Sequence, residues 1–544
     1  MSFTVWPPEV NSLLLLDGPG SGPMLEAAAA WEGISSELNS ALNAFGSVTS
    51  DLAGQAWQGP SSASMTNAAT RYVGWLEGAA ARADQSAAQA RAAATAFEAA
   101  LATIVDPGVV TANRGQLRAL VSGNIFGQFA PAIAAVEAEY EEMWAHDVSV
   151  MGGYHTSASA TVAQLGQWEL ALENLPGEFA GSLSVVEQEI QQLPTTVADG
   201  FTRVANTIIG TIFGAPAAPP FAASQTGTFS GGPSLVTRFE EAALWPVKPF
   251  LAFSGLEAQI ENPNSLLISL FTGNNPLLSP FISNSPPQLL TLLLGESVQY
   301  TTYNGMQVVQ ITPAHPTGNY VVAIHGGAFL IAPSIFHWLD YTVTAYQTGA
   351  TFEVPIYPLL QQGGTAGTVV PNMAGFISDQ VVARGAPHVS VIGDSAGGNL
   401  ALAATEYLVA NYPNPNLPGS MVLLSPWLDP AMTNPNIALV QDPLLPLGPA
   451  QVIGKEWAGN LPVSDYRVSP LNGTQYLNGL FPKTYVYSGN LDILSPDVLV
   501  LQQEAATAGA PFNFVLGNGE IHDWIILTLD GPQYWPQIDQ ELGI

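Results

Sequence analysis

The chain has 544 residues and is strongly acidic, with 43 Asp and Glu against 12 Lys and Arg and a formal net charge of −31. This balance argues against nucleic acid or an anionic membrane surface as an electrostatic partner. The chain contains no cysteine, which excludes disulfide bonds, thiol catalysis and thiolate metal sites. The length is sufficient for two or more domains, each with its own core.

The first residues do not predict a cleaved export signal or a membrane anchor. Residues 1–9 contain no basic residue, and the apolar run Leu13–Leu16 is too short for the core of a signal peptide. No stretch of about 18 uninterrupted apolar residues occurs, so no transmembrane helix is expected. If the protein leaves the cytoplasm, we expect it to do so without a cleaved signal.

Residues 19–155 are rich in Ala and have the apolar spacing of long amphipathic helices. The apolar positions of the first helix recur at steps of three and four residues: Ile34, Leu38, Leu42, Phe45, Val48 and Leu52. Breaks at Gly59-Pro60 and Asp106-Pro107-Gly108 predict a second long helix over 61–104 and further helix to His155. The result is an all-α bundle whose apolar stripe indicates a docking face for a partner. A self-contained bundle is the alternative.

Three separated motifs in this region carry a resemblance to a known family. They are Pro7-Pro8-Glu9, Trp57-Gln58-Gly59 between two helices, and Ala-Glu-Tyr-Glu-Glu-Met-Trp-Ala-His-Asp at 138–147. With these motifs, residues 1–176 resemble the mycobacterial PPE family. The resemblance implies a PE-family helical hairpin as partner, a type VII secretion chaperone bound at an apolar tip, and export to the cell envelope, the cell surface or the medium. By position, the tip is Ile125 and Phe126.

The composition changes after the helical region. Residues 177–233 are punctuated by Pro and Gly and predict an extended linker, with a protease-accessible part near Ala215 to Gln225 where the rest of the chain is released. A plain spacer is the alternative. Residues 234–299 are apolar with several prolines. They form either a cap over a substrate pocket or extra core helices.

The chemistry is concentrated around residues 389–399, Val-Ser-Val-Ile-Gly-Asp-Ser-Ala-Gly-Gly-Asn. An apolar run breaks there into Gly-x-Ser-x-Gly and then into an Ala-rich segment. This pattern predicts a strand, a tight turn that exposes Ser395, and a helix, which together form a nucleophile elbow. Gly393 and Gly397 allow the neighbouring backbone to approach the turn closely.

A second glycine-rich turn lies upstream of the elbow. The buried-strand pattern of residues 320–324 runs into His325 and Gly326, and the backbone that follows can present N–H groups to a developing oxyanion. We expect His325 and Gly326 to support this loop. The expected oxyanion donors are the N–H groups of Gly327, Ala328 and Ala396.

A serine nucleophile requires an acid and a histidine later in the chain. His522 is the only histidine after the elbow, and it follows the strand pattern 512–516. Asp492 lies in the loop after the strand pattern 484–487 and is the predicted acid. Two other residues remain alternatives for the acid: Asp429 and Asp497.

Strand and helix patterns alternate from about residue 300 to the end of the chain. They predict an α/β domain over 300–544 with a mainly parallel sheet and helices on both faces. The sequence contains no Gly-rich phosphate loop and no cluster of metal ligands, so neither a cofactor nor a metal is expected. His315, His337 and His388 stand alone and are assigned no role.

The motifs of this domain resemble the hormone-sensitive-lipase-like branch of the α/β-hydrolases. The matching positions are His325-Gly326-Gly327, residues 393–398, Ser469-Pro470-Leu471, Ser488-Gly489 with Asp492, and His522-Asp523-Trp524. Two positions depart from the family pattern: Ala328 replaces the third glycine of the oxyanion loop, and residues 354–360 replace the usual supporting stretch. The resemblance implies a serine hydrolase of carboxylic esters. Because residues 234–299 are apolar, we expect an acyl site that takes fatty chains, and therefore lipid esters as substrates.

Two hypotheses from different classes follow. In the first, the protein is an exported serine hydrolase, and the helical domain is its export address. In the second, it is an interaction protein whose hydrolase domain is degenerate and serves as a scaffold. The presence of Ser395, Asp492, His522 and the Gly326-Gly327 loop favours the first, because a scaffold requires none of them.

Overall fold

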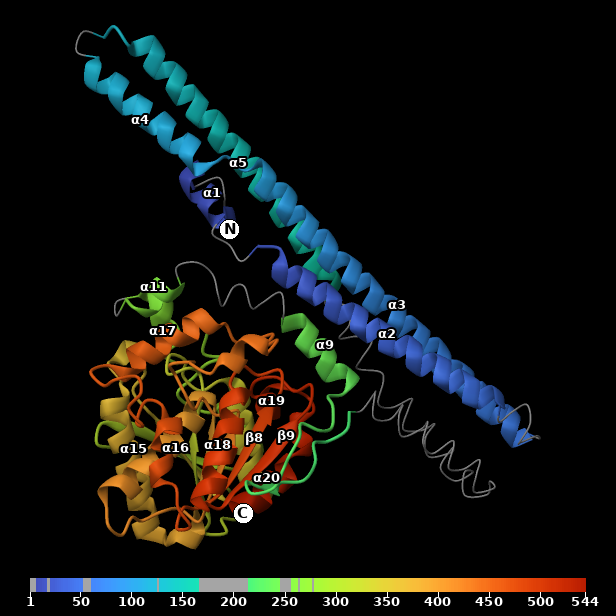
Figure 1. Ribbon diagram of the computed structural model, residues 1–544, viewed down its shortest axis with the longest axis vertical. Helices are drawn as coiled ribbons and strands as arrows, with labels where there is room; N and C mark the ends of the chain where they lie inside the picture. Colours follow the sequence, from blue (N-terminus) through green and yellow to red (C-terminus); the bar gives the residue numbers. More distant parts are fainter. Residues whose placement is uncertain are drawn as a thin grey trace. The chain divides into compact units, whose positions relative to one another are not determined.

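The computed structural model describes residues 6–16, 20–51, 60–124, 127–165, 214–244, 256–262, 265–275 and 278–544. The chain divides into two compact units (Figure 1). The helical unit is formed by Met1–Ile209 with Ala242–Ser254. The α/β unit is formed by Gly210–Glu241 with Gly255–Ile544.

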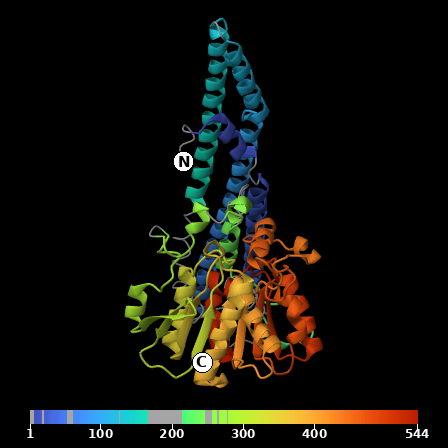
Figure 2. The same ribbon diagram turned by 90° about the vertical axis from the view of Figure 1, so that its left-hand side faces the viewer.

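The helical unit contains long helices that pack side by side (Figure 1, Figure 2). Its helices are α1 (Pro8–Leu16), α2 (Gly22–Asp51), α3 (Pro60–Thr103), α4 (Pro107–Gly123) and α5 (Ala130–Leu165). Helix α2 packs along α3, α5 packs against α3 and α4, and α1 contacts α4 and α5. The prediction of an all-α N-terminal region is confirmed.

Small and apolar side chains form the interior of this unit. One core cluster contains Leu15, Phe97, Ala100, Ile104 and Met151. The buried carboxylate of Asp147 on α5 accepts the hydroxyl of Ser12 at 2.7 Å and the backbone N–H of Val105 at 3.0 Å, and so joins α1 to the turn between α3 and α4. Asp106 caps α4 by accepting the N–H of Gly108, with Pro107 at the first helical position.

Two features predicted from the sequence lie outside the described residues: the proposed tip, Ile125 and Phe126, and the motif Trp57-Gln58-Gly59. Within the described chain, the segment Leu76–Gly123 is long and apolar enough to cross a membrane by length and composition alone. It is interrupted between α3 and α4, and a helix in the core of a bundle meets the same criterion. This match is therefore weak support for a membrane span.

A nine-stranded sheet in the order β1-β9-β8-β7-β6-β4-β5-β3-β2 organises the α/β unit. Its strands are β1 (Phe221–Ala222), β2 (Ser297–Tyr303), β3 (Met306–Thr312), β4 (Tyr320–Ile324), β5 (Thr351–Ile356), β6 (Val389–Asp394), β7 (Ser420–Leu424), β8 (Lys483–Gly489) and β9 (Phe512–Gly517). Strands β4 to β9 are all parallel, whereas β1 pairs antiparallel at one edge and β2 and β3 pair antiparallel at the other.

Helices cover both faces of this sheet (Figure 1, Figure 2). They are α14 (Ile335–Thr348), α15 (Ala366–Arg384), α16 (Ser395–Asn411), α17 (Leu447–Ala458), α18 (Ser495–Ala508), α19 (Trp524–Leu527) and α20 (Trp535–Leu542). Helices α14 and α20 contact each other and the sheet on one side, whereas α15 and α16 pack together on the other, with α18 over β8 and β9. Strands β4, β6 and β7 are almost continuously buried, as expected for a doubly covered sheet. The predicted architecture is confirmed.

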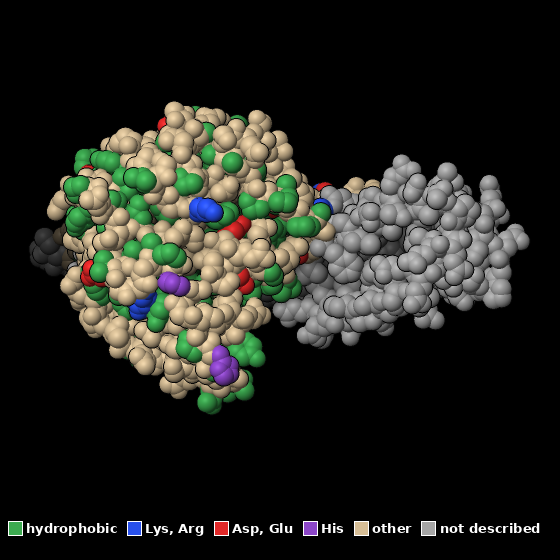
Figure 3. Space-filling view, turned by 90° about the horizontal axis from the view of Figure 1, so that it is seen from below, with side chains coloured by type: hydrophobic (Ala, Val, Ile, Leu, Met, Phe, Trp, Pro, Cys, Tyr) green, Lys and Arg blue, Asp and Glu red, His purple; other side chains and the backbone are tan. Residues whose placement is uncertain are grey.

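The surface of the α/β unit carries few charges. Figure 3 shows one face on which Lys, Arg, Asp and Glu side chains are scattered among apolar and uncharged polar groups. This agrees with a chain of which only 10% of the residues are charged. The acidic balance of the protein therefore reflects a scarcity of basic residues more than a dense acidic surface.

The linker predicted over 177–233 is wrong in its second part, and its first part, 177–213, lies outside the described residues. Residues 214–234, here called the strap, lie along the outer edge of the sheet, where β1 pairs with β9. The N–H of Ser230 donates to Leu516, and Asn518 donates back to Ser230. The glycines that indicated a linker instead form turns: Gly231 has a φ of +77°, and a Cβ there would clash with the Ala215 carbonyl. Cleavage near Ala215 to Gln225 would therefore cut a paired strand.

The apolar segment before the core contains short helices. They are α9 (Leu235–Leu244), α11 (Leu256–Ile260), α12 (Leu266–Ser269) and α13 (Gln288–Leu293). Helix α11 packs on α17, and the Phe271 carbonyl accepts the N–H of Ala332, so this part lies beside the loop that follows β4. Helix α13 instead contacts the edge strand β2. Whether the first part covers a substrate pocket stays a prediction.

Candidate active site

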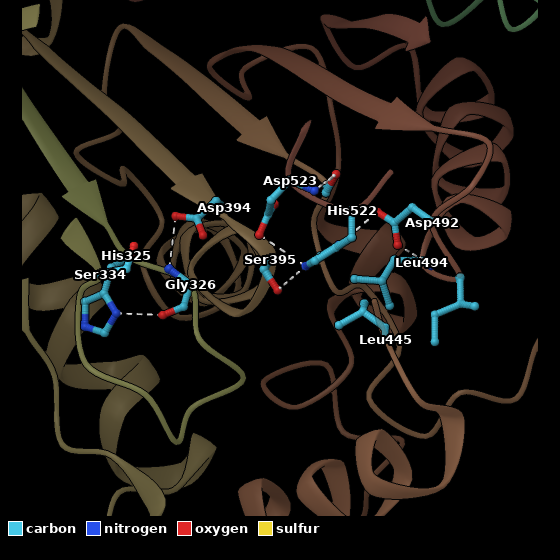
Figure 4. Close-up of polar contacts among 12 residues, drawn as sticks. His325, Gly326, Ser334, Asp394, Ser395, Leu445, Asp492, Leu494, His522 and Asp523 are labelled. Carbon is cyan, nitrogen blue, oxygen red and sulfur yellow. Dashed lines mark hydrogen bonds and ion pairs between the residues drawn. The ribbon is translucent and has the colours of Figure 1, made fainter. Parts of the chain in front are cut away.

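Ser395 lies where β6 turns directly into α16 (Figure 4). Its φ of 50° is in the left-handed region, which is unfavourable for a residue with a Cβ. The flanking glycines provide the space for this turn. A Cβ on Gly393 would lie 2.6 Å from the Gly397 carbonyl oxygen, and a Cβ on Gly397 would clash with the Ile324 carbonyl oxygen. The turn therefore requires glycine at both positions.

Three side chains from three loops form a continuous hydrogen-bonded chain. Ser395 Oγ lies 2.9 Å from His522 Nε2, and His522 Nδ1 lies 2.9 Å from Asp492 Oδ2. Asp492 follows β8 and His522 follows β9, and the parallel pairing of β6 to β9 brings the carboxyl ends of these strands to one edge of the sheet. The second oxygen of Asp492 accepts the N–H of Leu494 at 2.8 Å. In this arrangement the imidazole can remove the proton of the hydroxyl, and the carboxylate orients the imidazole.

His522 has a second carboxylate beside it. Asp523 Oδ2 lies 3.1 Å from His522 Nε2, the nitrogen that also contacts Ser395 (Figure 4). Burial lowers the pKa of His522, but the carboxylates of Asp523 and Asp492 outweigh this effect and raise that pKa well above its usual value. Burial also raises the pKa of Asp523 to about 6. The electrostatics of the site therefore favour a protonated imidazole.

The two rival aspartates point elsewhere. Asp429 accepts the N–H groups of Ala431 and Thr433 and the hydroxyls of Thr433 and Ser469. Asp497 accepts the side-chain amide of Asn434 at 2.9 Å. The carboxylate that contacts His522 Nδ1 is that of Asp492. The geometry thus favours Asp492 as the acid.

The loop after β4 has an unusual backbone. Gly327 has a φ of 107°, and the next two residues, Ala328 and Phe329, have φ values of 53° and 58°. Among the described residues, no hydrogen-bond partner is found for the N–H groups of Gly327 and Ala328. The N–H of Ala396 lies in the first turn of α16, where backbone donors have no intrahelical acceptor. Gly326, the residue before the first two donors, bonds to Asp394, the residue before Ser395, so the loop is attached to the elbow and its N–H groups are suited to bind an oxyanion.

His325 supports the oxyanion loop from below. Its ring stacks on Tyr357 with the centroids 4.4 Å apart, and its Nδ1 lies 2.7 Å from the Gly326 carbonyl oxygen. The Tyr357 hydroxyl donates to the carbonyl of His325 at 2.8 Å. Burial lowers the pKa of His325 to about 3, so the ring is neutral. Tyr357 belongs to the stretch 354–360 that departs from the family pattern, and this stretch therefore still supports the loop.

Sequence reasoning gave no role to His337, which belongs to the site. Its Nε2 lies 3.0 Å from Asp394 Oδ2, and its Nδ1 lies 2.7 Å from Ser334 Oγ at the cap of α14. The other oxygen of Asp394 accepts the N–H of Gly326 at 2.9 Å. The residue before Ser395 therefore clamps the oxyanion loop to the elbow. The Ser-x-x-His pattern at a helix start was the available signal.

The electrostatics of this clamp favour an ion pair. Burial opposes the charge on His337, but the Asp394 carboxylate overcomes it and raises the pKa of His337. Burial likewise raises the pKa of Asp394, but His337 and the Gly326 N–H overcome it, so that the pKa of Asp394 is lowered. The pair is thus charged over a wide pH range.

The loops that carry Asp492 and His522 are tied to each other. The N–H of Leu491 donates to the Glu520 carbonyl at 2.9 Å, and the N–H of Gly519 donates to the side chain of Asn490. A Cβ on Gly489 would clash with the Glu520 carbonyl, so this approach requires glycine. The strap supports the same region through its bonds to the end of β9. The predicted acid and base are therefore held as one piece.

Two family profiles match the chain, one for each unit. The PPE family profile matches residues 2–166, and the profile described as alpha/beta hydrolase fold matches residues 321–526. A protein of Mycobacterium tuberculosis named triacylglycerol lipase is 52% identical over 428 residues, which cover 79% of this chain and 88% of the relative. The PPE family protein PPE12 of the same species is 57% identical over 175 residues, covering 32% of this chain and 27% of the relative.

Solved structures of esterases are also similar. A protein of Staphylococcus aureus named as a putative esterase is 26% identical, with a TM-score of 0.44 and coverage of 52% of this chain and 94% of that chain. An esterase from the bacterial hormone-sensitive lipase family is 21% identical, with a TM-score of 0.40 and coverage of 52% and 97%.

Proposed function

Because the chain belongs to the PPE family and carries an α/β-hydrolase domain after its helical region, we propose that it is an exported serine hydrolase that cleaves lipid esters. The chain is a lipase or esterase in class, as its likeness to the triacylglycerol lipase over most of both chains supports. The observation that carries the proposal is the continuous chain from Ser395 through His522 to Asp492. A scaffold would have no need to keep these three side chains in hydrogen-bond contact.

In the proposed reaction, Ser395 Oγ attacks the ester carbonyl carbon while His522 Nε2 takes its proton. Asp492 holds the imidazole by its Nδ1–H and stabilises the positive charge that develops. The N–H groups of Gly327 and Ala328, together with that of Ala396 in the first turn of α16, bind the oxyanion of the tetrahedral intermediate. His522 then gives the proton to the leaving alcohol, and a water repeats the sequence to release the fatty acid.

The clamp at Asp394 explains why the oxyanion loop stays in place. The N–H of Gly326 donates to Asp394, which is the last residue of β6 and precedes Ser395, so the loop and the nucleophile share one support. This leaves the next two N–H groups for the substrate. Donors that are already in position stabilise the oxyanion most, because no free energy is needed to reorient them as the charge develops.

Lipid esters are the proposed substrates. The support is the similarity to the relative named triacylglycerol lipase and the apolar segment that lies partly beside the loop after β4. Chain-length profiling with p-nitrophenyl esters and emulsified triacylglycerols tests the proposal. We expect turnover of long acyl chains. Activity confined to acetyl and butyryl esters would leave a short-chain esterase.

The alternative is a PPE scaffold with an inactive hydrolase domain. A fluorophosphonate probe distinguishes the two, because it reacts only with an activated serine. We expect labelling of the purified full chain at Ser395 and loss of labelling in Ser395→Ala. No label on folded wild-type protein would favour the scaffold.

The helical unit is the proposed export address. The support is its match to the PPE family, for which a PE helical hairpin as partner and a type VII chaperone are expected. Exposed apolar residues on α1, Val10, Leu13 and Leu16, are consistent with a partner surface. The chaperone site is proposed at Ile125 and Phe126. Phe126→Asp should block export in the native host without changing esterase activity, and normal secretion of this variant would remove the tip assignment.

Release of the hydrolase is proposed to require a cut before residue 214. The strap pairs with β9 and contacts the loop that leads to His522, so a cut within it would damage the catalytic unit. An inserted protease site within 177–213 should release an active fragment, whereas one at Gln225 should reduce activity. Equal activity after both cuts would show that the strap is dispensable.

A further inference from the structure

Two carboxylates face one imidazole, and the reaction described above uses only one of them. Asp492 contacts Nδ1 of His522, whereas Asp523 Oδ2 lies 3.1 Å from Nε2. Ser395 Oγ lies 2.9 Å from the same Nε2 (Figure 4). A ring nitrogen makes one hydrogen bond, either as a donor or as an acceptor. Ser395 and Asp523 therefore compete for Nε2.

The structure holds Asp523 firmly in this position. Asp523 as a whole residue is 7% exposed, and its backbone has a left-handed φ of 52° at the start of α19. Its N–H donates to Ser425 Oγ at 3.0 Å, and the next residue, Trp524, is fully buried. Within the described chain, the ion pair found for Asp523 is with His522. Its contact with the imidazole is thus built into the fold and does not depend on a mobile surface side chain.

We propose that Asp523 is a second positioning carboxylate for His522, one that takes the Nε2–H of the imidazolium in the resting enzyme and so sets the pH at which Ser395 becomes reactive. The inference rests on the proposed function, because it assigns His522 the role of base. When the imidazolium loses its Nε2 proton to solvent, Nε2 turns to accept the hydroxyl of Ser395. Only that form can start the reaction.

Asp523 has two opposite effects on the proton transfer. Its charge stabilises the imidazolium before the reaction, which raises the pH needed to obtain a neutral base. Its charge also stabilises the imidazolium formed when the proton moves from Ser395 Oγ to Nε2 as the Oγ–carbon bond forms. The same proton passes to the leaving oxygen when the ester C–O bond breaks. Removal of the charge should therefore weaken the base and also make it available at lower pH.

Other ionisable groups near His522 do not take this role. The charged groups that act on His522 are Asp492 after β8, Asp523 before α19 and Asp442 before α17, and those that act on Asp523 also include Asp394 at the end of β6 and His337 on α14. Asp394 is paired with His337, and Asp442 accepts the N–H groups of Leu444, Leu445 and Ile493. Asp492 and Asp523 are the carboxylates in contact with the ring. Their charges oppose the effect of burial and raise the pKa of His522.

Asp523→Asn in the full chain tests the inference. Asn has the shape of Asp and tolerates a left-handed backbone equally well, so the variant removes the charge and little else. The readout is the second-order rate of inactivation by a small fluorophosphonate as a function of pH, which does not depend on a lipid surface. The acid limb of the variant should move to lower pH by about one unit or more. Its alkaline plateau should fall by about tenfold, so the two curves cross.

The control is Asp379→Asn, which makes the same change in charge at an exposed residue that accepts the Tyr303 hydroxyl. It should leave the acid limb in place. If wild-type protein is not labelled at Ser395, the proposed function fails. If wild-type protein is labelled and the acid limb of Asp523→Asn coincides with that of wild type, Asp523 is structural only and the inference is overturned.

A measurement on the wild type keeps the inference testable if the Asn variant does not fold. The chain has 7 histidines, so nitrogen NMR of ring-labelled protein can follow His522, identified by its loss in His522→Gln. We expect both ring nitrogens of His522 to carry protons at pH 7. A neutral ring at that pH would overturn the inference, even if Ser395 reacts with the probe.

Discussion

The helical unit and the α/β unit differ in where the backbone adopts unfavourable conformations. Every described non-glycine residue with a positive φ lies in the α/β unit: Asn304, Ala328, Phe329, Ser395, Ser425, Met432 and Asp523. Ala328 and Phe329 belong to the oxyanion loop, and Ser395, Ser425 and Asp523 lie at or beside the triad. Among the described residues of the helical unit, only glycines have a positive φ. Strain is therefore concentrated where side chains must meet in one geometry.

Buried charge shows the same contrast. Among the described residues of the helical unit, Asp147 is the buried charged residue, and the other buried side chains are apolar or belong to Ser and Asn. In the α/β unit, Asp394, Asp442, Asp492 and Asp523 are all buried at the catalytic edge of the sheet. Buried carboxylates lower stability unless they are paired or hydrogen-bonded. The buried carboxylates of the α/β unit thus hold the catalytic side chains in place at a cost in folding stability. The helical unit carries no comparable cluster among its described residues, and its exposed apolar surface is suited to binding.

Ser395→Ala is the substitution with the largest expected effect. It removes the nucleophile, so hydrolysis of p-nitrophenyl esters should fall by about four orders of magnitude or more. The thermal unfolding curve serves as the control, because the hydroxyl makes one hydrogen bond and its loss should leave the fold intact. Substantial residual turnover in a folded variant would contradict the assignment.

Asp492→Asn should have the next largest effect on ester hydrolysis. The amide reverses the hydrogen bond to Nδ1 and favours the wrong tautomer of His522, which should lower kcat by about three to four orders of magnitude. The matched variant is Asp429→Asn, in which a buried aspartate with other partners loses its charge. We expect less than about a tenfold change in kcat for it. A larger effect at 429 than at 492 would transfer the role of acid to Asp429.

The pair of His337 and Asp394 predicts a pH-dependent contribution to stability. The folded pKa of His337 is raised, so its stabilisation is complete below the unfolded pKa and is lost as the pH rises through the folded value. The folded pKa of Asp394 is lowered, so its stabilisation is complete above the unfolded pKa and is lost as the pH falls through the folded value. Both contributions are present between about pH 4 and 6.5.

His337→Gln should therefore destabilise the α/β unit most in weak acid. The amide keeps a donor for Asp394 but removes the charge, so we expect a loss of about 2 kcal/mol near pH 5.5 and a smaller loss at pH 9. Urea unfolding at the two pH values measures it. His388→Gln, at an exposed histidine that contacts Asn319, is the control. An equal loss at both pH values would show that the charge of His337 does not contribute.

Gly397→Ala tests the claim that the elbow is sterically closed. The added methyl would clash with the Ile324 carbonyl on the neighbouring strand, and backbone cannot move aside as a flexible side chain can. We expect a loss of about 3 kcal/mol of unfolding free energy, or no folded protein. Wild-type stability in urea would show that β4 and α16 can separate at this point.

Much of this architecture follows from local sequence. The central strands are predicted by their apolar runs, and the elbow by glycines that a close backbone approach requires. Ser395, Asp492 and His522 are found because each follows a strand in a parallel sheet, and parallel strands end at the same edge. Local pattern is sufficient wherever a residue's position depends on its own strand and turn.

Contacts between distant segments could not be read in this way. His337 and Asp394 are 57 residues apart, and nothing near either residue in the sequence indicates the other. The sequence of the strap predicts a linker because a two-residue strand carries no periodic signal, and its glycines and prolines are equally typical of linkers. Asp523 is part of the His522-Asp523-Trp524 motif, but its contact with Nε2 depends on a left-handed turn that composition does not predict.

Gly33→Ala, in α2, should have the smallest effect and the opposite sign to Gly397→Ala. Gly33 is exposed, and a Cβ there would meet no atom within 4 Å. The methyl should reduce the backbone freedom of the unfolded chain and stabilise the helix by about 0.5 to 1 kcal/mol. Amide hydrogen exchange within α2 reports this locally and is separate from unfolding of the α/β unit. Ala29→Gly, at another exposed position of the same helix, should speed exchange to a similar extent. If Gly33→Ala destabilised α2, position 33 would have to lie against another chain, and the helical unit would then share the steric constraint that we assign to the elbow.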